Sequence, residues 1–279
     1  MSEQVSPEEE AQRSVTERIE REEFARGHLA PDAQPAAPRD AATIVLARES
    51  EAESFEVLLL RRPHTSRFAA GAFVFPGGTI DPADADEEMA DRLPVTGPDA
   101  EPAAVIAALR ELFEETGLLL GSHVPQEDRS VLRHQLLEEN RPFRGVLEDH
   151  DISFAPLDVC YFARWITPAQ FSRRYDTRFF LATLPADQAG FEPELTDEMT
   201  DFVWLTPERA IELFRSGRLP MLFPTRVTLQ ALAEFPSIEE MVAVFATKRV
   251  EPLTPRLLIK GNSIRPVLPG DPEYETADA

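Results

Sequence analysis

The spacing of hydrophobic positions changes several times along the chain, and each spacing predicts a different kind of element. Short runs rich in Val, Ile, Leu and Phe predict strands, whereas apolar residues that recur every three to four positions predict helices. Strands are predicted in AATIVLARE, FEVLLLRR, DVCYFARWITP, TRFFLATLP and DFVWL, and a short apolar run, AFVF, leads into PGG. Helices are predicted over about 101–116 and in PQEDRSVLRHQLLEENRPF, TPERAIELFRSG, PTRVTLQALAEF and SIEEMVAVFATK, and a hairpin in PRLLIKGNSIRPVLP. Because strands precede, interrupt and follow the helices, we expect a mixed α/β fold with helical additions.

The same pattern divides the chain into three parts. Residues 1–40 are charged on nearly every face and end in a Pro/Ala-rich stretch, which predicts a flexible or loosely docked N-terminal segment. Residues 41–270 carry the predicted strands and helices and form the main domain. Within it, an acidic, proline-containing loop insertion is expected at about 79–100. Residues 271–279 are an acidic tail.

Composition narrows the function classes. The net charge of −22 disfavours nucleic-acid binding, which usually needs a basic patch, and an anionic substrate must then be met by local arginines or metal ions. A single cysteine, Cys160, excludes an intrachain disulfide and favours a reducing compartment. The sequence contains neither an apolar run long enough for a membrane span nor the start of a signal peptide. We therefore expect a cytoplasmic protein with no membrane and no nucleic-acid partner.

The segment ALRELFEETGLLL, residues 108–120, places three glutamates in the last turns of a predicted helix, where the helix dipole disfavours negative charge. On a helical wheel, Glu114 and Glu115 lie about 60° and 40° to either side of Glu111, opposite the apolar residues. One interpretation is a solvated helix face. The other is a site for a divalent cation such as Mg²⁺, because hard cations take carboxylate oxygens as ligands.

The residues RELFEETGL, from Arg110 to Leu118, resemble the end of the Nudix box, whose pattern is G-x5-E-x7-R-E-U-x-E-E-x-G-U with U aliphatic. FPGG ahead of a helix resembles the entry to the same box. The resemblance implies a Nudix α/β/α sandwich with a mixed sheet and helical insertions. Counting back from Arg110 puts the first box glutamate at Pro102, so we expect Glu101 or no residue to take that role. A better match starts the box at Gly77–Gly78 and places extra residues in the loop.

The resemblance also implies roles for individual residues. Glu111 and Glu115 would be direct ligands of Mg²⁺ or Mn²⁺, and the Gly78 carbonyl would complete the shell. Glu114 would be a further ligand or an outer-shell group, and Arg110 would orient the cluster through an ion pair. The general base differs among Nudix subfamilies.

Two further predictions concern the base and the substrate. ELTDEMTDFVW supplies acids just before a strand, and Glu198 is the candidate base, with a solvated loop acid as the alternative. Arginine suits bidentate contacts with phosphate. Of the arginines in this acidic chain, Arg67, Arg164 and Arg178 are the predicted substrate-binding residues, although each could instead be a surface ion-pair partner.

Most of residues 41–270 are similar to the acyl-coenzyme A diphosphatase branch of the family. This resemblance implies a metal-dependent hydrolase that cleaves coenzyme A or acyl-coenzyme A to adenosine 3′,5′-bisphosphate and (acyl-)phosphopantetheine. One alternative is a Nudix diphosphatase acting on ADP-ribose, a dinucleotide or a nucleotide sugar, and another is a non-catalytic ligand-sensing domain. The expected partner is a small nucleoside diphosphate derivative of the coenzyme A type. The oligomeric state is left open, with a homodimer as one alternative.

Overall fold

The computed structural model describes residues 34–50, 55–66, 69–90, 95–96, 100–122, 124–152, 159–260 and 263–277. Most of the predicted N-terminal segment, Arg67 and the turn of the predicted hairpin lie outside these ranges. Within them, no helix has both the length and the apolar composition that a membrane span requires.

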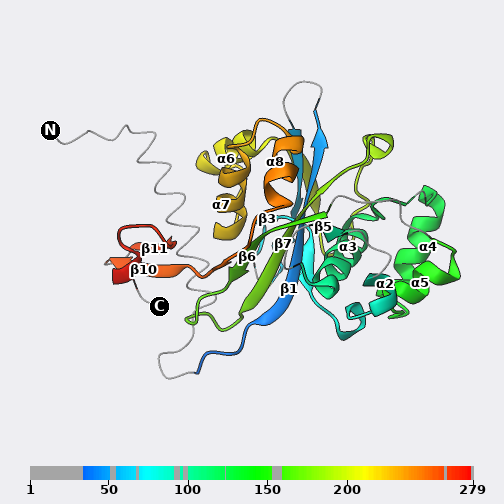
Figure 1. The fold of residues 1–279 in the computed structure, drawn as a ribbon, viewed down its shortest axis with the longest axis horizontal. Helices are drawn as coiled ribbons and strands as arrows, with labels where there is room; N and C mark the ends of the chain where they lie inside the picture. Colours follow the sequence, from blue (N-terminus) through cyan, green and yellow to red (C-terminus); the bar gives the residue numbers. More distant parts are fainter. Residues whose placement is uncertain are drawn as a thin grey trace.

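One mixed sheet forms the centre of the molecule (Figure 1). In the described part of the chain it has nine strands, with a main path of β3-β2-β1-β7-β6-β5 and with β4, β8 and β9 paired to β1, β2 and β6. Their bounds are β1 Arg39–Glu49, β2 Phe55–Arg61, β3 Phe73–Val74, β4 Gly77–Thr79, β5 Val95–Thr96, β6 Val159–Ile166, β7 Tyr175–Thr183, β8 Asp201–Leu205 and β9 Pro252–Leu253. The five predicted sheet strands are all present, as β1, β2, β6, β7 and β8.

Strand β1 positions the site because it pairs with β4 along one edge and with β7 along the other. It runs parallel to β7 and antiparallel to β4, so that Ala42 is in register with both Arg178 and Gly78. The strand is buried on both faces from Ile44 to Ala47, which explains its nearly continuous apolar sequence.

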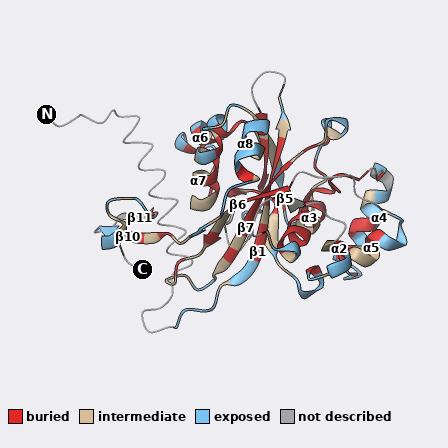
Figure 2. Cartoon of the chain, viewed as in Figure 1, coloured by how far each residue is buried: buried red, intermediate tan, exposed pale blue. Residues whose placement is uncertain are grey.

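Helices cover both faces of the sheet (Figure 1). The helices on one face are α2 Glu87–Ala90, α3 Pro102–Thr116, α4 Gln126–Leu137 and α5 Phe143–Asp149. Those on the other face are α6 Pro207–Arg215, α7 Phe223–Leu232 and α8 Ile238–Phe245. Each layer closes its own core, one built around α3 and one around α6–α8, and buried residues follow the sheet between them (Figure 2). The arrangement is the expected α/β/α sandwich with helical additions.

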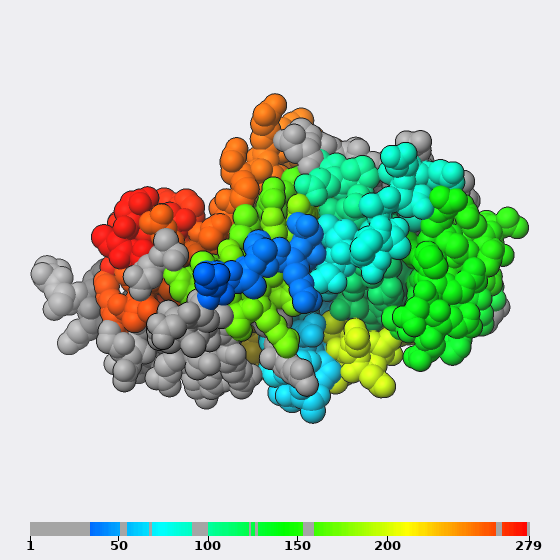
Figure 3. Space-filling model, turned by 90° about the horizontal axis from the view of Figure 1, so that it is seen from below, coloured from blue at the N-terminus to red at the C-terminus, as the bar shows by residue number. Residues whose placement is uncertain are grey.

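The remaining elements lie at the two ends of the molecule. The helical addition α4–α5 forms one end, and the C-terminal hairpin forms the other (Figure 3). This hairpin pairs β10 Arg256–Lys260 with β11 Ser263–Val267, as predicted, and a short 3₁₀ turn at Tyr274–Thr276 packs beside it. The predicted loop insertion contains a 3₁₀ turn at Pro82–Asp84, helix α2 and strand β5.

Candidate active site

Helix α3 carries the three predicted glutamates and packs over β1 and β4. Proline occupies its first turn, and Gly117 ends it with a left-handed φ of 75°, a conformation that glycine adopts without strain. The side chain of Glu115 is buried, and those of Glu111 and Glu114 are only 15% and 18% exposed. The interpretation as a solvated helix face is therefore wrong, because these carboxylates point into the protein.

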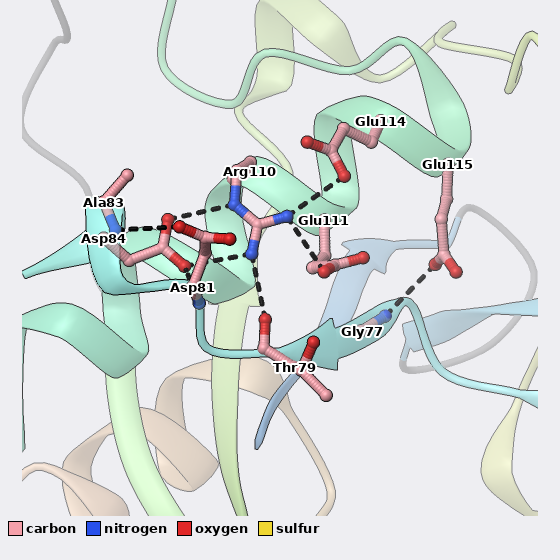
Figure 4. A network of polar contacts seen from close by, with 9 residues as sticks. All are labelled: Gly77, Thr79, Asp81, Ala83, Asp84, Arg110, Glu111, Glu114 and Glu115. Atoms are coloured by element: carbon pink, nitrogen blue, oxygen red, sulfur yellow. Dashed lines mark hydrogen bonds and ion pairs between the residues drawn. The ribbon is translucent and has the colours of Figure 1, made fainter. Parts of the chain in front are cut away.

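Arg110 is the hub of the site (Figure 4). Its Nη1 donates to Glu111 Oε1 at 2.9 Å and to Glu114 Oε2 at 3.0 Å. Its Nε and Nη2 donate to the two carboxylate oxygens of Asp84, each at 2.9 Å, and Nη2 also donates to the Thr79 carbonyl at 3.0 Å. These contacts use every N–H of a guanidinium group. Arg110 therefore forms ion pairs with the acids and has no donor left for a substrate, while its role in orienting the cluster stays a prediction.

Asp84 is the site residue that the sequence interpretation missed. Its side chain is buried, it accepts the backbone N–H of Asp81 at 2.7 Å, and it forms the forked ion pair with Arg110. Asp84 lies six positions after Gly78, which is the position of the first acid in the G-x5-E part of the box pattern. Glu101 does not take this role, because it pairs with Arg178 at the opposite end of α3. Counting forward from Gly78, instead of back from Arg110, would have found Asp84.

The glycine turn of FPGG meets the acidic helix at close range. The Gly77 N–H donates to Glu115 Oε2 at 3.1 Å. A Cβ placed on Gly78 would lie 2.3 Å from Glu111 Oε1, well inside van der Waals contact. Glycine is required at position 78 because the main chain and the Glu111 carboxylate share this space. Both residues predicted as ligands on α3 thus touch the predicted glycine turn.

Burial and like charge shift the acidity of the three glutamates in the same direction. Burial raises the pKa of Glu111 to about 7, with Arg110 opposing the rise and Glu114 adding to it. Burial also raises the pKa of Glu114, again against the charge of Arg110. For Glu115, burial raises the pKa well above its ordinary value, the charge of Glu111 adds to this, and the Gly77 N–H and Arg62 oppose it. A positive charge at this site would offset the repulsion among the three glutamates and so stabilise their ionised forms.

The chemistry of these donors fits a hard divalent cation, because carboxylate and carbonyl oxygens are the ligands such ions take. The side chains do not form a preorganised coordination site. Among the described residues, no group of three or more His, Cys, Asp or Glu side chains is arranged to hold a metal ion. Arg110 draws Glu111 and Glu114 toward itself, whereas Glu115 turns to Gly77. The fit therefore rests on donor type and charge, and Glu111, Glu115 and the Gly78 carbonyl stay the predicted ligands.

Glu198 is exposed and lies on the loop between η2 (Ala186–Gln188) and β8, close to the acidic helix. Its charge contributes to the raised pKa of Glu114 and of Glu115, after the larger effect of burial on both. The structure therefore brings the predicted base toward the predicted ligands, although the two come from distant segments. Its role as a base stays a prediction.

Two of the predicted substrate-binding arginines, Arg164 and Arg178, occupy a different place. Arg164 forms a forked pair with Asp176, and Arg178 pairs with Asp40 and Glu101 near the start of α3. The spacing of strands places the Arg178 backbone about 10 Å from that of Gly78, across β1. Neither side chain contacts the acidic helix end, Arg67 lies outside the described residues, and substrate binding by all three stays a prediction.

Known proteins resemble the chain in both sequence and structure. The NUDT19 Nudix domain model matches residues 98–230. Acyl-coenzyme A diphosphatase NUDT19 of Xenopus laevis is 27% identical over 81% of this chain and 73% of its own length. The human protein of the same name is 27% identical over 86% of this chain and 81% of its own length. The crystal structure of a NUDIX hydrolase from Alicyclobacillus acidocaldarius is 32% identical, covers 75% of this chain and 97% of that one, and superposes with a TM-score of 0.62.

The chain therefore belongs to the Nudix hydrolase family, as its helix α3 and glycine turn indicate, and the enzyme is a pyrophosphohydrolase. Within the family, its similarity lies with the branch of the NUDT19 relatives.

Proposed function

We propose that this enzyme is a divalent-metal-dependent diphosphatase that cleaves coenzyme A or acyl-coenzyme A to adenosine 3′,5′-bisphosphate and (acyl-)phosphopantetheine. The observation that carries the proposal is the gathering of three glutamates with raised pKa values at one helix end, where Glu111 and Glu115 meet the Gly77–Gly78 turn and Glu114 is held by Arg110. Two relatives that match over most of this chain bear the name acyl-coenzyme A diphosphatase, which supports the choice of substrate.

A bound Mg²⁺ or Mn²⁺ would offset the charge of the diphosphate and make a water molecule more acidic. Glu111, Glu115 and the Gly78 carbonyl are the groups that would hold it. Arg110 keeps Glu111 and Glu114 in place through its fixed fork of donors. We assign Glu198 the role of accepting the proton of the attacking water at its carboxylate, because its loop faces the acidic helix end.

A substrate panel tests this proposal. The purified enzyme is incubated with Mg²⁺ or Mn²⁺ and coenzyme A, an acyl-coenzyme A, 3′-dephospho-coenzyme A, ADP-ribose or a dinucleotide, and the products are identified by mass spectrometry. We expect a higher kcat/KM for the coenzyme A compounds than for 3′-dephospho-coenzyme A, because the 3′-phosphate offers an arginine an additional contact. Equal or reversed preference supports the ADP-ribose or dinucleotide alternative. Absence of turnover on every diphosphate overturns the proposal.

A further inference from the structure

Arg133 connects the helical addition to the active site, although it lies outside the Nudix box. It belongs to α4, and its side chain is buried. Its Nη2 donates to the backbone carbonyl of Glu114 at 2.7 Å, and its Nη1 donates to the backbone carbonyl of Glu194 at 2.8 Å. One planar guanidinium group thus bridges the acidic end of α3 and the loop that leads to Glu198.

The contact with Glu114 also offsets negative charge at the C-terminal end of α3. Carbonyls in the last turn of a helix lack a helical N–H partner and carry partial negative charge. The guanidinium group of Arg133 supplies both a donor and a positive charge at this helix end. It therefore opposes the unfavourable effect of placing Glu114 and Glu115 there.

The loop of Glu198 is fixed on both sides of that residue. On one side, the Glu194 N–H donates to the Thr116 carbonyl at 2.8 Å, next to the contact with Arg133. On the other, the Thr200 N–H donates to the Arg61 carbonyl at 2.8 Å, and Met199 is buried in the core of α3. Glu198 is exposed between these attachments, so its position relative to α3 depends on both of them.

We propose that Arg133 is a positioning residue, which sets the separation between Glu198 and the acidic end of α3. The inference rests on the proposed function, in which Glu198 accepts the proton of the attacking water. Arginine suits this task because its two Nη groups lie at a fixed distance in one plane, whereas lysine offers a single flexible charge. The competing explanation is that Arg133 only attaches α4 to the core.

The test compares Arg133→Met with a control, Arg141→Met, which removes an arginine whose side-chain partners, Asp149 and Gln135, both lie in the helical addition. For Arg133→Met we expect kcat to fall by roughly 10- to 100-fold, because small misplacements of a reacting group are costly, while KM stays within about twofold of the wild-type value. The control keeps the wild-type kcat. Guanidinium ion added at millimolar concentration should restore part of the lost kcat.

A double variant separates positioning from attachment. If Arg133 acts through Glu198, then Arg133→Met should lower kcat much less in a Glu198→Gln background than in the wild type. Losses that multiply independently overturn the proposal, as does a kcat for Arg133→Met that equals that of the control. If Arg133→Met does not fold, Arg133→Lys takes its place in the same comparison, with the same expected loss of kcat.

Hydrogen–deuterium exchange gives a reading that needs no turnover. The amides of residues 194–200 should exchange faster in Arg133→Met than in wild type or Arg141→Met. Unchanged exchange in this loop contradicts the proposal even if the enzyme is inactive. If the wild type shows no turnover but the loop of Arg133→Met exchanges faster, the proposed function is refuted, while the role of Arg133 in holding the loop is supported.

Discussion

Asp84 and Arg110 are joined by two parallel hydrogen bonds of 2.9 Å each, although 26 positions separate them in the sequence. The pair spans the insertion. It brings Asp84, at the first acidic position of the box, into contact with Arg110, the arginine of the box. Relative to the box pattern, the extra residues therefore follow Asp84, so the insertion begins later than the predicted position 79, and the two halves of the box stay in contact.

This pair provides the first prediction. Asp84→Asn removes the charge but keeps the shape, and leaves the buried guanidinium of Arg110 without its forked partner. Because Glu111 and Glu114 still pair with Arg110, we expect a loss of about 1–3 kcal/mol in the free energy of unfolding, measured by urea denaturation. Asp128→Asn, at an exposed position on α4, should change stability by less than about 0.5 kcal/mol. A stability for Asp84→Asn equal to that of this control would show that the pair contributes little.

Gly78 provides the second prediction. Gly78→Ala would place a Cβ 2.3 Å from Glu111 Oε1, so the carboxylate must leave its place beside the turn. We expect diphosphatase activity to fall by at least about 100-fold, since a misplaced group at the reacting centre has effects of this size. Gly190→Ala is the control, because a Cβ there meets no atom within 4 Å. Near-normal activity of Gly78→Ala would contradict the close packing of this turn against Glu111.

The third prediction concerns pH. The hydrogen bond from Arg164 holds the pKa of Asp176 below its ordinary value of 3.8, against the opposing effect of burial. A carboxylate with a lowered folded-state pKa stabilises the fold above its unfolded pKa, and this stabilisation is lost as the pH falls through the folded pKa. The wild type should therefore exceed Asp176→Asn in unfolding free energy by a constant amount between about pH 5 and 7, and the difference should shrink below about pH 4. A difference that grows on acidification would refute this assignment.

The sequence predicted the elements well where local signals were strong. Gly117 ends α3 in the left-handed conformation, and β1 and β2 follow from their runs of apolar residues. The part of the site within one helix was also predictable, because Glu111, Glu114 and Glu115 share a helical face and Arg110 lies one turn before Glu114, whatever surrounds them.

Contacts between distant segments could not be read in the same way. The partner of Arg110 depends on the path of an insertion of irregular length, and the contacts of Arg133 depend on how α4 packs against α3 and the 194–200 loop. Likewise, the substrate role predicted for Arg164 took no account of Asp176, which lies across the strand pair β6–β7 and binds it in a fork. Charge and residue type alone do not distinguish an arginine in an ion pair with a carboxylate from one that is available to bind phosphate.

In the proposed function, the carboxylates of α3 are tolerated because they bind a divalent cation used in catalysis. The most direct test compares wild type and Glu115→Gln with and without Mg²⁺. The measured quantities are the thermal unfolding temperature and the rate of coenzyme A turnover. Without metal, the variant should be as stable as the wild type or slightly more so, because the substitution removes a like-charge repulsion between Glu111 and Glu115. With saturating Mg²⁺, the wild type should gain stability by mass action and the variant much less, and turnover by the variant should be lower by orders of magnitude. Near-normal turnover together with an unchanged Mg²⁺ response in Glu115→Gln would contradict the account.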